Sequence, residues 1–270
     1  MTKHTAIVHH VLELPALHGP FHIIGDVHGC FGELVELLEL LKYKVVFDET
    51  QKRYKVTRPD KSILVFVGDL VDRGPNSPEV MRLVMDMAED GLAYCVSGNH
   101  DDKLLRLLLG RNVRVRHGLE HTVEQLKGYN AAFKDRMKEF LLQLPHHIIF
   151  DEGRLVVAHA GLQEKLHGLN TKGVRELCLY GPTTGETDDL GLPIRLDWAA
   201  EYCGKAIVVY GHTPVHEPLW RNNTINIDTG CVFGGRLTAL TYPDHILTSV
   251  DSYDTYAKAV RPFIKYHHHH

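Results

Sequence analysis

Five short apolar segments of this 270-residue chain are each followed by glycine and by a side chain that can bind a metal ion. The segments are residues 21–24, 63–67, 92–96, 155–157 and 207–210, and their β-branched composition predicts buried strands. The polar residues that follow them are Asp26, His28, Asp69, Asn99, His159 and His212. Glycine permits the sharp turns that would bring these strand ends together. A lone histidine is usually an ordinary packing residue, but five successive placements of this kind predict a metal site.

Helical patterns separate the early strands. Leucines recur at three- and four-residue intervals in residues 31–42, which predicts a helix with one apolar face. Residues 78–90 carry a similar stripe and open with Pro78, a residue favoured in the first turn of a helix. Further helices are predicted at residues 101–110 and 130–144, and further strands at 225–227 and 237–241. This order predicts an α/β (α+β) fold in which helices flank layered sheets.

The organisation of the chain predicts one domain. Residues 1–266 contain no Pro/Gly/Ser-rich linker and no internal repeat, and His267–His270 read as the remnant of an expression tag. A hydrophobic content of 44% and a charged content of 24% are ordinary for a globular protein. Because no apolar run approaches the roughly 20 residues of a membrane span, and the start lacks a secretory signal, we predict a cytoplasmic protein without a membrane partner.

The charge balance and the cysteine pattern argue against polyanion-coating proteins, disulfide-rich proteins and zinc-cage proteins. Thirty Lys and Arg against 34 Asp and Glu give a net charge of −4, which argues against a protein that coats polyanions. Five widely spread cysteines without a C-x-x-C pair predict reduced, mostly buried thiols rather than a disulfide framework or a zinc cage. No obligate protein partner is evident, and the sequence does not determine the oligomeric state.

The predicted ligands indicate which metal ions fit. Asp26 and His28 are two residues apart, so in an extended segment both side chains would point to the same side. Carboxylate, imidazole and amide oxygen together suit Mn, Fe or Zn rather than a metal that prefers thiolates. Six ligands with a bridging carboxylate fit two ions about 3.5–4 Å apart, an arrangement that activates water against phosphoesters.

The motifs GDVHG, GDLVDRG, GNHD, VVAHAG and YGHTP occur in this order between Gly25 and about Gly235. This pattern resembles the calcineurin-like metallophosphoesterases, specifically their phosphoprotein-phosphatase branch. The resemblance implies a double β-sandwich flanked by α-helices and a two-metal centre, most readily of Mn, with Fe, Zn, Ni or Co as alternatives. It assigns one ion to Asp26, His28 and Asp69. It assigns the other to Asp69, Asn99, His159 and His212.

The same resemblance assigns roles to residues beside the ligands. It places His100 as the group that protonates the leaving oxygen, a role that suits imidazole near neutral pH. Asp72 would orient His100, as carboxylates orient catalytic histidines, and Arg73 would hold phosphate oxygens with its planar fork. Asp228 reads either as an active-site carboxylate behind His212 or as a residue that stabilises the turn before Thr229.

The later segments narrow the substrate class. YGPTTGET, LPIRLDWAAEY and NIDTGCVFGGRLTAL are similar to the phosphatase module of bacterial polynucleotide kinase-phosphatase and to diadenosine tetraphosphatase-like phosphatases. The chain has no GxxxxGK[ST] loop, so we expect the kinase and ligase modules that accompany the RNA-healing enzyme to be absent, which disfavours a dedicated RNA-repair role. We therefore expect a bis(5′-nucleosyl)-tetraphosphatase. Alternatives are a protein serine/threonine phosphatase, an RNA-end 2′,3′-cyclic phosphodiesterase/phosphomonoesterase, and a catalytically silent scaffold, which the intact residue set disfavours.

A run of basic residues follows the GNHD motif. Between Lys103 and His117 the chain carries five Lys and Arg residues and no acid. This run could hold further phosphates of a small nucleotide or of a nucleic-acid end, or it could be a solvated surface. Arg175 and Arg195 are weaker candidates for phosphate contacts. No aromatic ladder accompanies the run, which disfavours binding of long single strands by base stacking.

Overall fold

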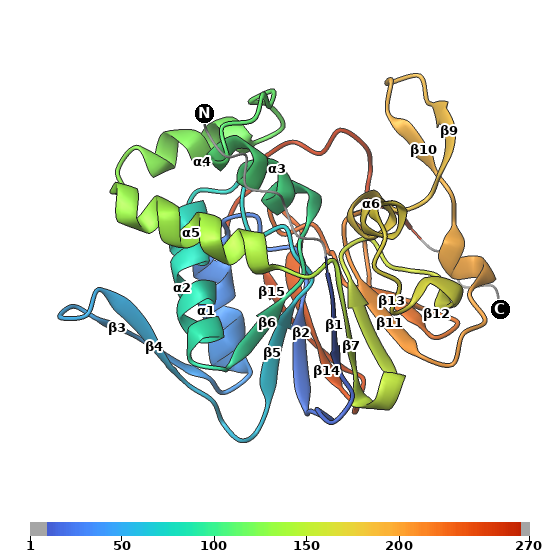
Figure 1. Cartoon of the computed structure of the whole chain (residues 1–270), viewed down its shortest axis with the longest axis horizontal. Helices are drawn as coiled ribbons and strands as arrows, with labels where there is room; N and C mark the ends of the chain where they lie inside the picture. The colour runs from blue at the N-terminus through green and yellow to red at the C-terminus, as the bar shows by residue number, and fades with distance from the viewer. Residues whose placement is uncertain (1–9, 266–270) are drawn as a thin grey trace.

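A computed structural model describes residues 10–265, so the predicted tag at His267–His270 lies outside the described residues. Two β-sheets form the centre of the molecule (Figure 1). One has the order β15-β14-β2-β5-β6, with β2 Phe21–Ile24, β5 Ile63–Phe66, β6 Ala93–Cys95, β14 Arg236–Tyr242 and β15 Ile246–Asp251. The other has the order β1-β7-β8-β11-β13-β12, with β1 Val11–Leu14, β7 His147–Phe150, β8 Leu155–Ala158, β11 Ile207–Tyr210, β12 Trp220–Arg221 and β13 Thr224–Asn226.

The sheets face each other across an apolar layer. Alternate residues of β2, Phe21 and Ile23, are fully buried in this layer, where they meet Val157 of β8 and Val209 of β11. Successive side chains of a strand point to opposite faces, so Ile24 lies on the other face of the sheet, against which the helices pack. Both faces of β2 and β5 are therefore buried, which explains their uninterrupted apolar sequences.

Helices cover the outer face of the five-stranded sheet (Figure 1). These are α1 Phe31–Leu40, α2 Ser77–Glu89, α3 Asn99–Leu108, α4 Leu119–Leu126 and α5 Ala131–Gln143, and α6 Lys172–Tyr180 lies by the other sheet. Two hairpins project from the body: β3 Lys44–Asp48 with β4 Arg53–Thr57, and β9 Thr183–Thr187 with β10 Pro193–Arg195. Short 3₁₀ turns occur at Asp151–Gly153, Glu164–Leu166 and Trp198–Glu201.

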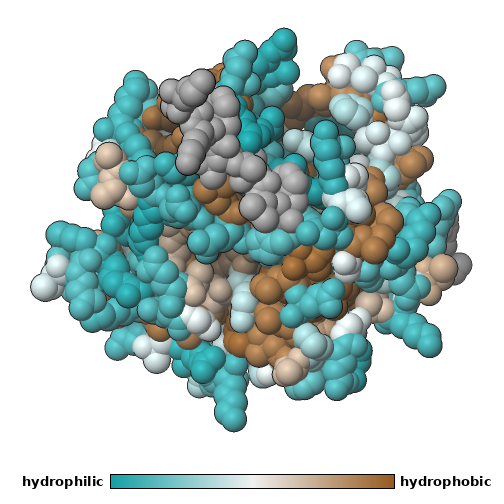
Figure 2. All heavy atoms as spheres, in the orientation of Figure 1, coloured by the Kyte–Doolittle hydropathy of each residue, from teal (hydrophilic) through white to brown (hydrophobic). Residues whose placement is uncertain are grey.

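The two-sheet fold flanked by helices confirms the predicted class, and the predicted elements exist with end shifts of one to two residues. Sequence periodicity missed α4, α6, both hairpins and the strands β1, β7, β12 and β15, which are short or exposed. Figure 2 shows a largely hydrophilic surface on this face, with apolar side chains gathered near β1 and β7. Among the described residues, no helix is long and apolar enough to cross a membrane.

Candidate metal centre and active site

The predicted ligands converge at one end of the two sheets. Asp26 and His28 follow β2, Asp69 follows β5, and Asn99 begins α3 just after β6. From the second sheet, His159 follows β8 and His212 follows β11. These strands run parallel within each sheet, so their carboxyl ends lie at a common edge. The loops that leave this edge carry all the candidate ligands.

The backbone of these loops is strained at several positions. Five residues other than glycine have positive φ angles there: His28 at 43°, Asp69 at 52°, Asp72 at 75°, Arg73 at 71° and His212 at 74°. Such conformations cost of order 1–3 kcal/mol each and persist where the surrounding structure imposes them. The turn at His28 also corrects one prediction, because Asp26 and His28 do not lie in an extended segment with a shared side.

Asp69 lies at the middle of the cluster. Its Oδ2 is 3.4 Å from Nε2 of His28 and 3.3 Å from Nε2 of His159. It belongs to both tight groups of potential ligand atoms around it, one with His28 and His100 and the other with His159 and His212. Its Oδ1 accepts the backbone N–H of His100 at 2.9 Å. A carboxylate in this position can bridge two cations.

Asn99 joins the second group. Its Oδ1 lies 2.9 Å from Nε2 of His159 and 3.0 Å from Nδ1 of His212, and these two nitrogens are 3.2 Å apart. The Nδ1–H groups of His28 and His159 donate to the backbone carbonyls of Val71 and Val67, at 2.7 and 2.9 Å. These bonds fix the tautomers and leave the Nε2 lone pairs directed at Asp69, as in metal sites whose histidines are oriented from behind.

The carboxylate, amide and imidazole lone pairs of these residues therefore point toward one another, with few protons available to separate them. In addition, Nε2 of His212 is buried without a hydrogen-bond partner. Burial alone would raise the pKa of Asp69, but His159 and His100 outweigh it and hold that pKa well below its ordinary value. Burial alone would lower the pKa of His159, but Asp69 outweighs it and raises that pKa to about 10. The cluster therefore stabilises added positive charge, either a proton on His159 or a metal ion that displaces it. The residues fit a metal centre.

Asp26 lies on the His212 side of the cluster. Its two carboxylate oxygens are 3.2 and 3.3 Å from the backbone nitrogen of His212, which donates to them. Burial and the nearby Asp228 raise the pKa of Asp26 well above its ordinary value. Asp228 is itself buried, which raises its pKa to about 6 although the Gly230 N–H donates to its Oδ1 at 3.0 Å. Asp228 therefore both stabilises the turn and adds negative charge beside Asp26.

His100, the predicted proton donor, is held by Asp72. Its Nδ1 lies 2.7 Å from Oδ2 of Asp72, and both residues are buried. The hydroxyl of Thr122, from α4, donates to the other oxygen of Asp72 at 2.7 Å. Sequence reasoning missed Thr122, because it lies 50 residues from Asp72 and no local pattern connects them. Two buried hydrogen bonds therefore connect Thr122 to Asp72 and Asp72 to His100.

Arg73 is fixed between the cluster and an aromatic ring. Its Nη1 is 3.3 Å from Nε2 of His28, and its Cζ lies 5.1 Å from the ring centroid of Phe233. A side chain at Gly118 would collide with Arg73, and the Arg73 backbone N–H donates to the Gly118 carbonyl at 3.1 Å. The guanidinium is therefore oriented beside the candidate ligands.

Asp101 is a second residue that sequence reasoning missed. Its buried carboxylate accepts the backbone N–H groups of Asp69 at 2.7 Å, Leu70 at 2.9 Å and Gly98 at 2.9 Å. Burial, with the nearby Asp69, raises its pKa to about 7. Asp101 ties the loop after β5 to the start of α3, and its position in the GNHD motif was the available signal.

The basic run lines a cavity of about 440 Å³ next to His100, which we name the basic cavity. Its cationic side chains are Arg73, Lys103, Arg106, Arg114 and Arg116, and no carboxylate is among its described lining residues. Arg111 lines a neighbouring cavity instead. Arg175 pairs with Asp102, which also pairs with Arg106, whereas Arg195 lies beside His212 in a separate cavity.

A third group of potential ligands, His146, His147 and Cys178, is buried elsewhere. Nε2 of His147 accepts the Gly168 N–H at 3.0 Å, and its Nδ1 is 2.8 Å from Nδ1 of His146. Burial, with the neighbouring His146, lowers the pKa of His147 to about 3. A neutral imidazole that accepts at Nε2 carries its proton on Nδ1, so this nitrogen donates to His146 rather than binding a metal. These histidines bond to each other and to Gly168 and are packing residues rather than metal ligands.

We expect Thr122→Val to lower kcat roughly tenfold with KM nearly unchanged, because partners behind a functional group typically contribute 10- to 100-fold. Valine has nearly the same shape but cannot donate to Asp72, so His100 loses its orientation rather than its chemistry. Thr122→Ser should restore kcat. A raised KM with unaltered kcat, measured alongside the thermal unfolding midpoint, would contradict this positioning role.

Comparison with known proteins agrees with this geometry. A bis(5′-nucleosyl)-tetraphosphatase PrpE (asymmetrical) of Anoxybacillus flavithermus is 46% identical over 248 residues, which cover 90% of this chain and 99% of that protein. The protein of the same name from Halalkalibacterium halodurans is 48% identical over 236 residues, covering 86% and 94% of the two chains. A crystal structure to which diadenosine tetraphosphatase activity is ascribed has a TM-score of 0.65 and 30% identity, covering 91% and 99%. Residues 19–248 match the calcineurin-like phosphoesterase family, and the chain belongs to this family of divalent-metal hydrolases.

Proposed function

We propose that this protein is a two-metal dinucleoside tetraphosphatase that cleaves its substrate asymmetrically. The observation that carries the proposal is the basic cavity beside His100, whose five cations and absence of described carboxylates suit a substrate with several successive phosphates. The relatives from Anoxybacillus flavithermus and Halalkalibacterium halodurans support it, because they carry this name and align with 86–90% of the chain.

The metal ligands that we propose are those of the convergent cluster. One ion would be held by His28 and Asp69 together with Asp26, whose carboxylate accepts the His212 backbone N–H and is in neither tight group of ligand atoms. The other would be held by Asp69, Asn99, His159 and His212. Oxygen and imidazole donors without thiolate favour Mn, with Fe, Zn, Ni and Co as alternatives. When bound, such ions neutralise phosphate charge and make water a nucleophile at neutral pH.

The remaining roles belong to the chain's own side chains. Arg73 would orient the phosphoryl oxygens, because its guanidinium is fixed beside His28. His100 would give a proton to the departing oxygen, and Asp72 would hold the imidazole in the required tautomer. The charge of Asp228 next to Asp26 would strengthen binding of the ion that Asp26 holds.

We expect a direct comparison with manganese to favour diadenosine tetraphosphate over a phosphopeptide and over an RNA 2′,3′-cyclic end, in kcat/KM. The physical reason is that neither alternative places a chain of phosphates in the basic cavity. Turnover of all three substrates by one preparation gives the ranking. If the phosphopeptide is preferred more than tenfold, the chain is a protein phosphatase instead; preference for the RNA end would indicate RNA healing.

A further inference from the structure

A second cavity opens on the other side of Arg73, and we name it the apolar cavity. It has a volume of about 710 Å³ and lies between His28, His212, the β9–β10 hairpin and the C-terminal segment 257–264. Arg73 and His117 line both this cavity and the basic cavity. The candidate active site therefore lies between two compartments of different chemistry.

The apolar cavity has the walls of a binding site for a flat, weakly polar group. Leu192, Ile194, Phe233, Val260 and Ile264 line it, together with four cationic residues (Arg73, Arg195, Lys258 and Arg261) and three acidic ones (Glu120, Asp188 and Asp228). Val260 is 67% exposed and Ile194 is 37% exposed, so these side chains are available to a ligand. Arg261 of the C-terminal segment pairs with Asp188 and also donates to the Pro193 carbonyl, which holds the segment against the hairpin. The volume lies within the 300–1,000 Å³ typical of small-molecule sites.

The catalytic groups are divided between the two cavities. His28, His212 and Asp228 line the apolar cavity, whereas Asn99 and His100 line the basic cavity. A group that protonates the leaving oxygen must lie on the side to which the leaving group departs. The leaving group therefore departs into the basic cavity, and the part of the substrate that keeps the attacked phosphorus stays on the apolar side.

We propose that the substrate lies across Arg73 with one nucleoside in the apolar cavity and the remaining phosphates in the basic cavity. This inference rests on the proposed tetraphosphatase function and adds which phosphorus is attacked. The oxygen of water bonds to the phosphorus that carries the apolar-side nucleoside, and the bond from that phosphorus to the next bridging oxygen breaks. The electron pair stays on that oxygen, which His100 protonates, and the proton that the attacking water loses is released to solvent, from which His100 is reprotonated. The products are a nucleoside monophosphate and a nucleoside triphosphate.

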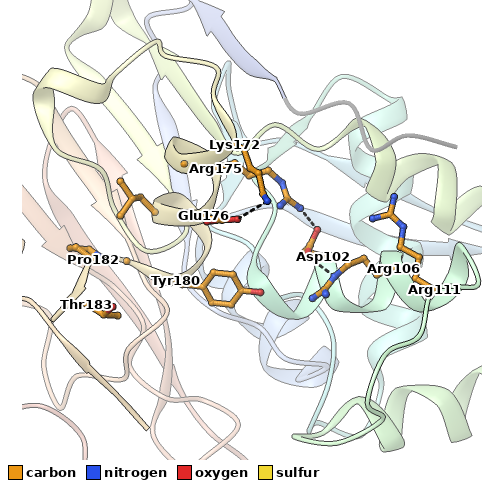
Figure 3. A pocket seen from close by; sticks show the side chains of 12 residues that line it. Asp102, Arg106, Arg111, Lys172, Arg175, Glu176, Tyr180, Pro182 and Thr183 are labelled. Atoms are coloured by element: carbon orange, nitrogen blue, oxygen red, sulfur yellow. Dashed lines mark hydrogen bonds and ion pairs between the residues drawn. The ribbon is translucent and has the colours of Figure 1, made fainter. Parts of the chain in front are cut away.

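The far end of the basic cavity offers a place for the second nucleoside. Arg106 and Tyr180 are shared with a further cavity of about 890 Å³, drawn in Figure 3. There Asp102 pairs with both Arg106 and Arg175, so the positive charge is partly neutralised. Tyr180, 42% exposed at the end of α6, extends toward Asp102 and can stack on a base. Arg111 and Lys172 also line this cavity, so the exposed ring of Tyr180, rather than a loss of positive charge, marks the place for a base.

The direction of attack is tested by hydrolysing diadenosine tetraphosphate in ¹⁸O-labelled water and analysing the products by mass spectrometry. We expect AMP to carry the label and ATP to be unlabelled. Label in ATP would overturn the inference while leaving the asymmetric tetraphosphatase function intact, whereas cleavage to two ADP would overturn both the inference and the asymmetric cleavage. Failure to hydrolyse the substrate at all would overturn the proposed function, and the binding experiment below still tests the cavities.

The two compartments are tested by calorimetric binding of AMP and of magnesium tripolyphosphate to the metal-loaded enzyme. Arg114→Ala/Arg116→Ala removes two exposed cations of the basic cavity and should weaken tripolyphosphate roughly tenfold while changing AMP little. Ile194→Ser/Val260→Ser should weaken binding of AMP roughly fivefold, because apolar contact is lost, while changing the binding of tripolyphosphate little.

Matched controls separate site effects from general ones. Arg58→Ala/Lys61→Ala removes the same charge from exposed residues that precede β5, at the end of the strand opposite Asp69. Leu190→Ser/Ile246→Ser removes exposed apolar side chains that do not line the cavity. Both controls should bind AMP and tripolyphosphate like the wild type. If both site variants weaken both ligands equally, or neither weakens either, the division into two compartments is wrong.

Discussion

Asp69→Asn is expected to lower phosphoesterase activity by about 10³-fold or more, because a metal centre contributes several kcal/mol of transition-state stabilisation. Asp69 is the one carboxylate within 3.4 Å of both His28 Nε2 and His159 Nε2 among the described residues, so its charge serves both proposed ions. Asparagine keeps the size of the side chain and can still accept the His100 N–H. The loss therefore reports on charge rather than on folding.

Metal content, measured by inductively coupled plasma mass spectrometry after gel filtration, should fall together with activity. Asp60→Asn is a suitable control, because Asp60 is an exposed carboxylate that bonds only to nearby Ser62. Removing metal from the wild type with a chelator should abolish turnover, and manganese should restore it. Unchanged activity after complete metal removal would refute the metal mechanism, and a fully loaded, active Asp69→Asn protein would refute the bridging role.

His100→Ala is expected to lower turnover of an alkyl phosphate by roughly 10²–10⁴-fold, the usual contribution of general acid catalysis. The loss should be much smaller with p-nitrophenyl phosphate, because nitrophenolate leaves readily without a proton. The backbone N–H of His100, which bonds to Asp69, is retained in the variant. The difference between the two substrates therefore isolates proton donation.

His216→Ala serves as a control, since the His216 side chain is 60% exposed and lines neither the basic cavity nor the apolar cavity. It should leave both substrates unaffected. Equal losses of His100→Ala with the alkyl and nitrophenyl substrates would remove the proton-donor role and point instead to a contribution to metal or phosphate binding. Asp72→Asn should show the same leaving-group dependence at smaller magnitude, because it acts only through His100.

Most of the candidate ligand set could be predicted because the signal is local. Each buried strand has a continuous apolar sequence, and the turn that follows it must expose polar groups at the sheet edge. Asp69, Asn99, His159 and His212 are found together for this reason. The prediction for Asp26 and His28 was less accurate, because it assumed extended backbone where His28 turns at a φ of 43°.

By itself, the sequence determined the fold class, the family and the identity of the side chains at the sheet edge, because these depend on periodicity and short motifs. Only the tertiary structure decided how those side chains are supported and what surrounds them. Thr122 reaches Asp72 across 50 residues, and the C-terminal segment meets the β9–β10 hairpin through Arg261 and Asp188, 73 residues apart. Such contacts depend on how separate elements pack, and no local pattern of residues encodes them.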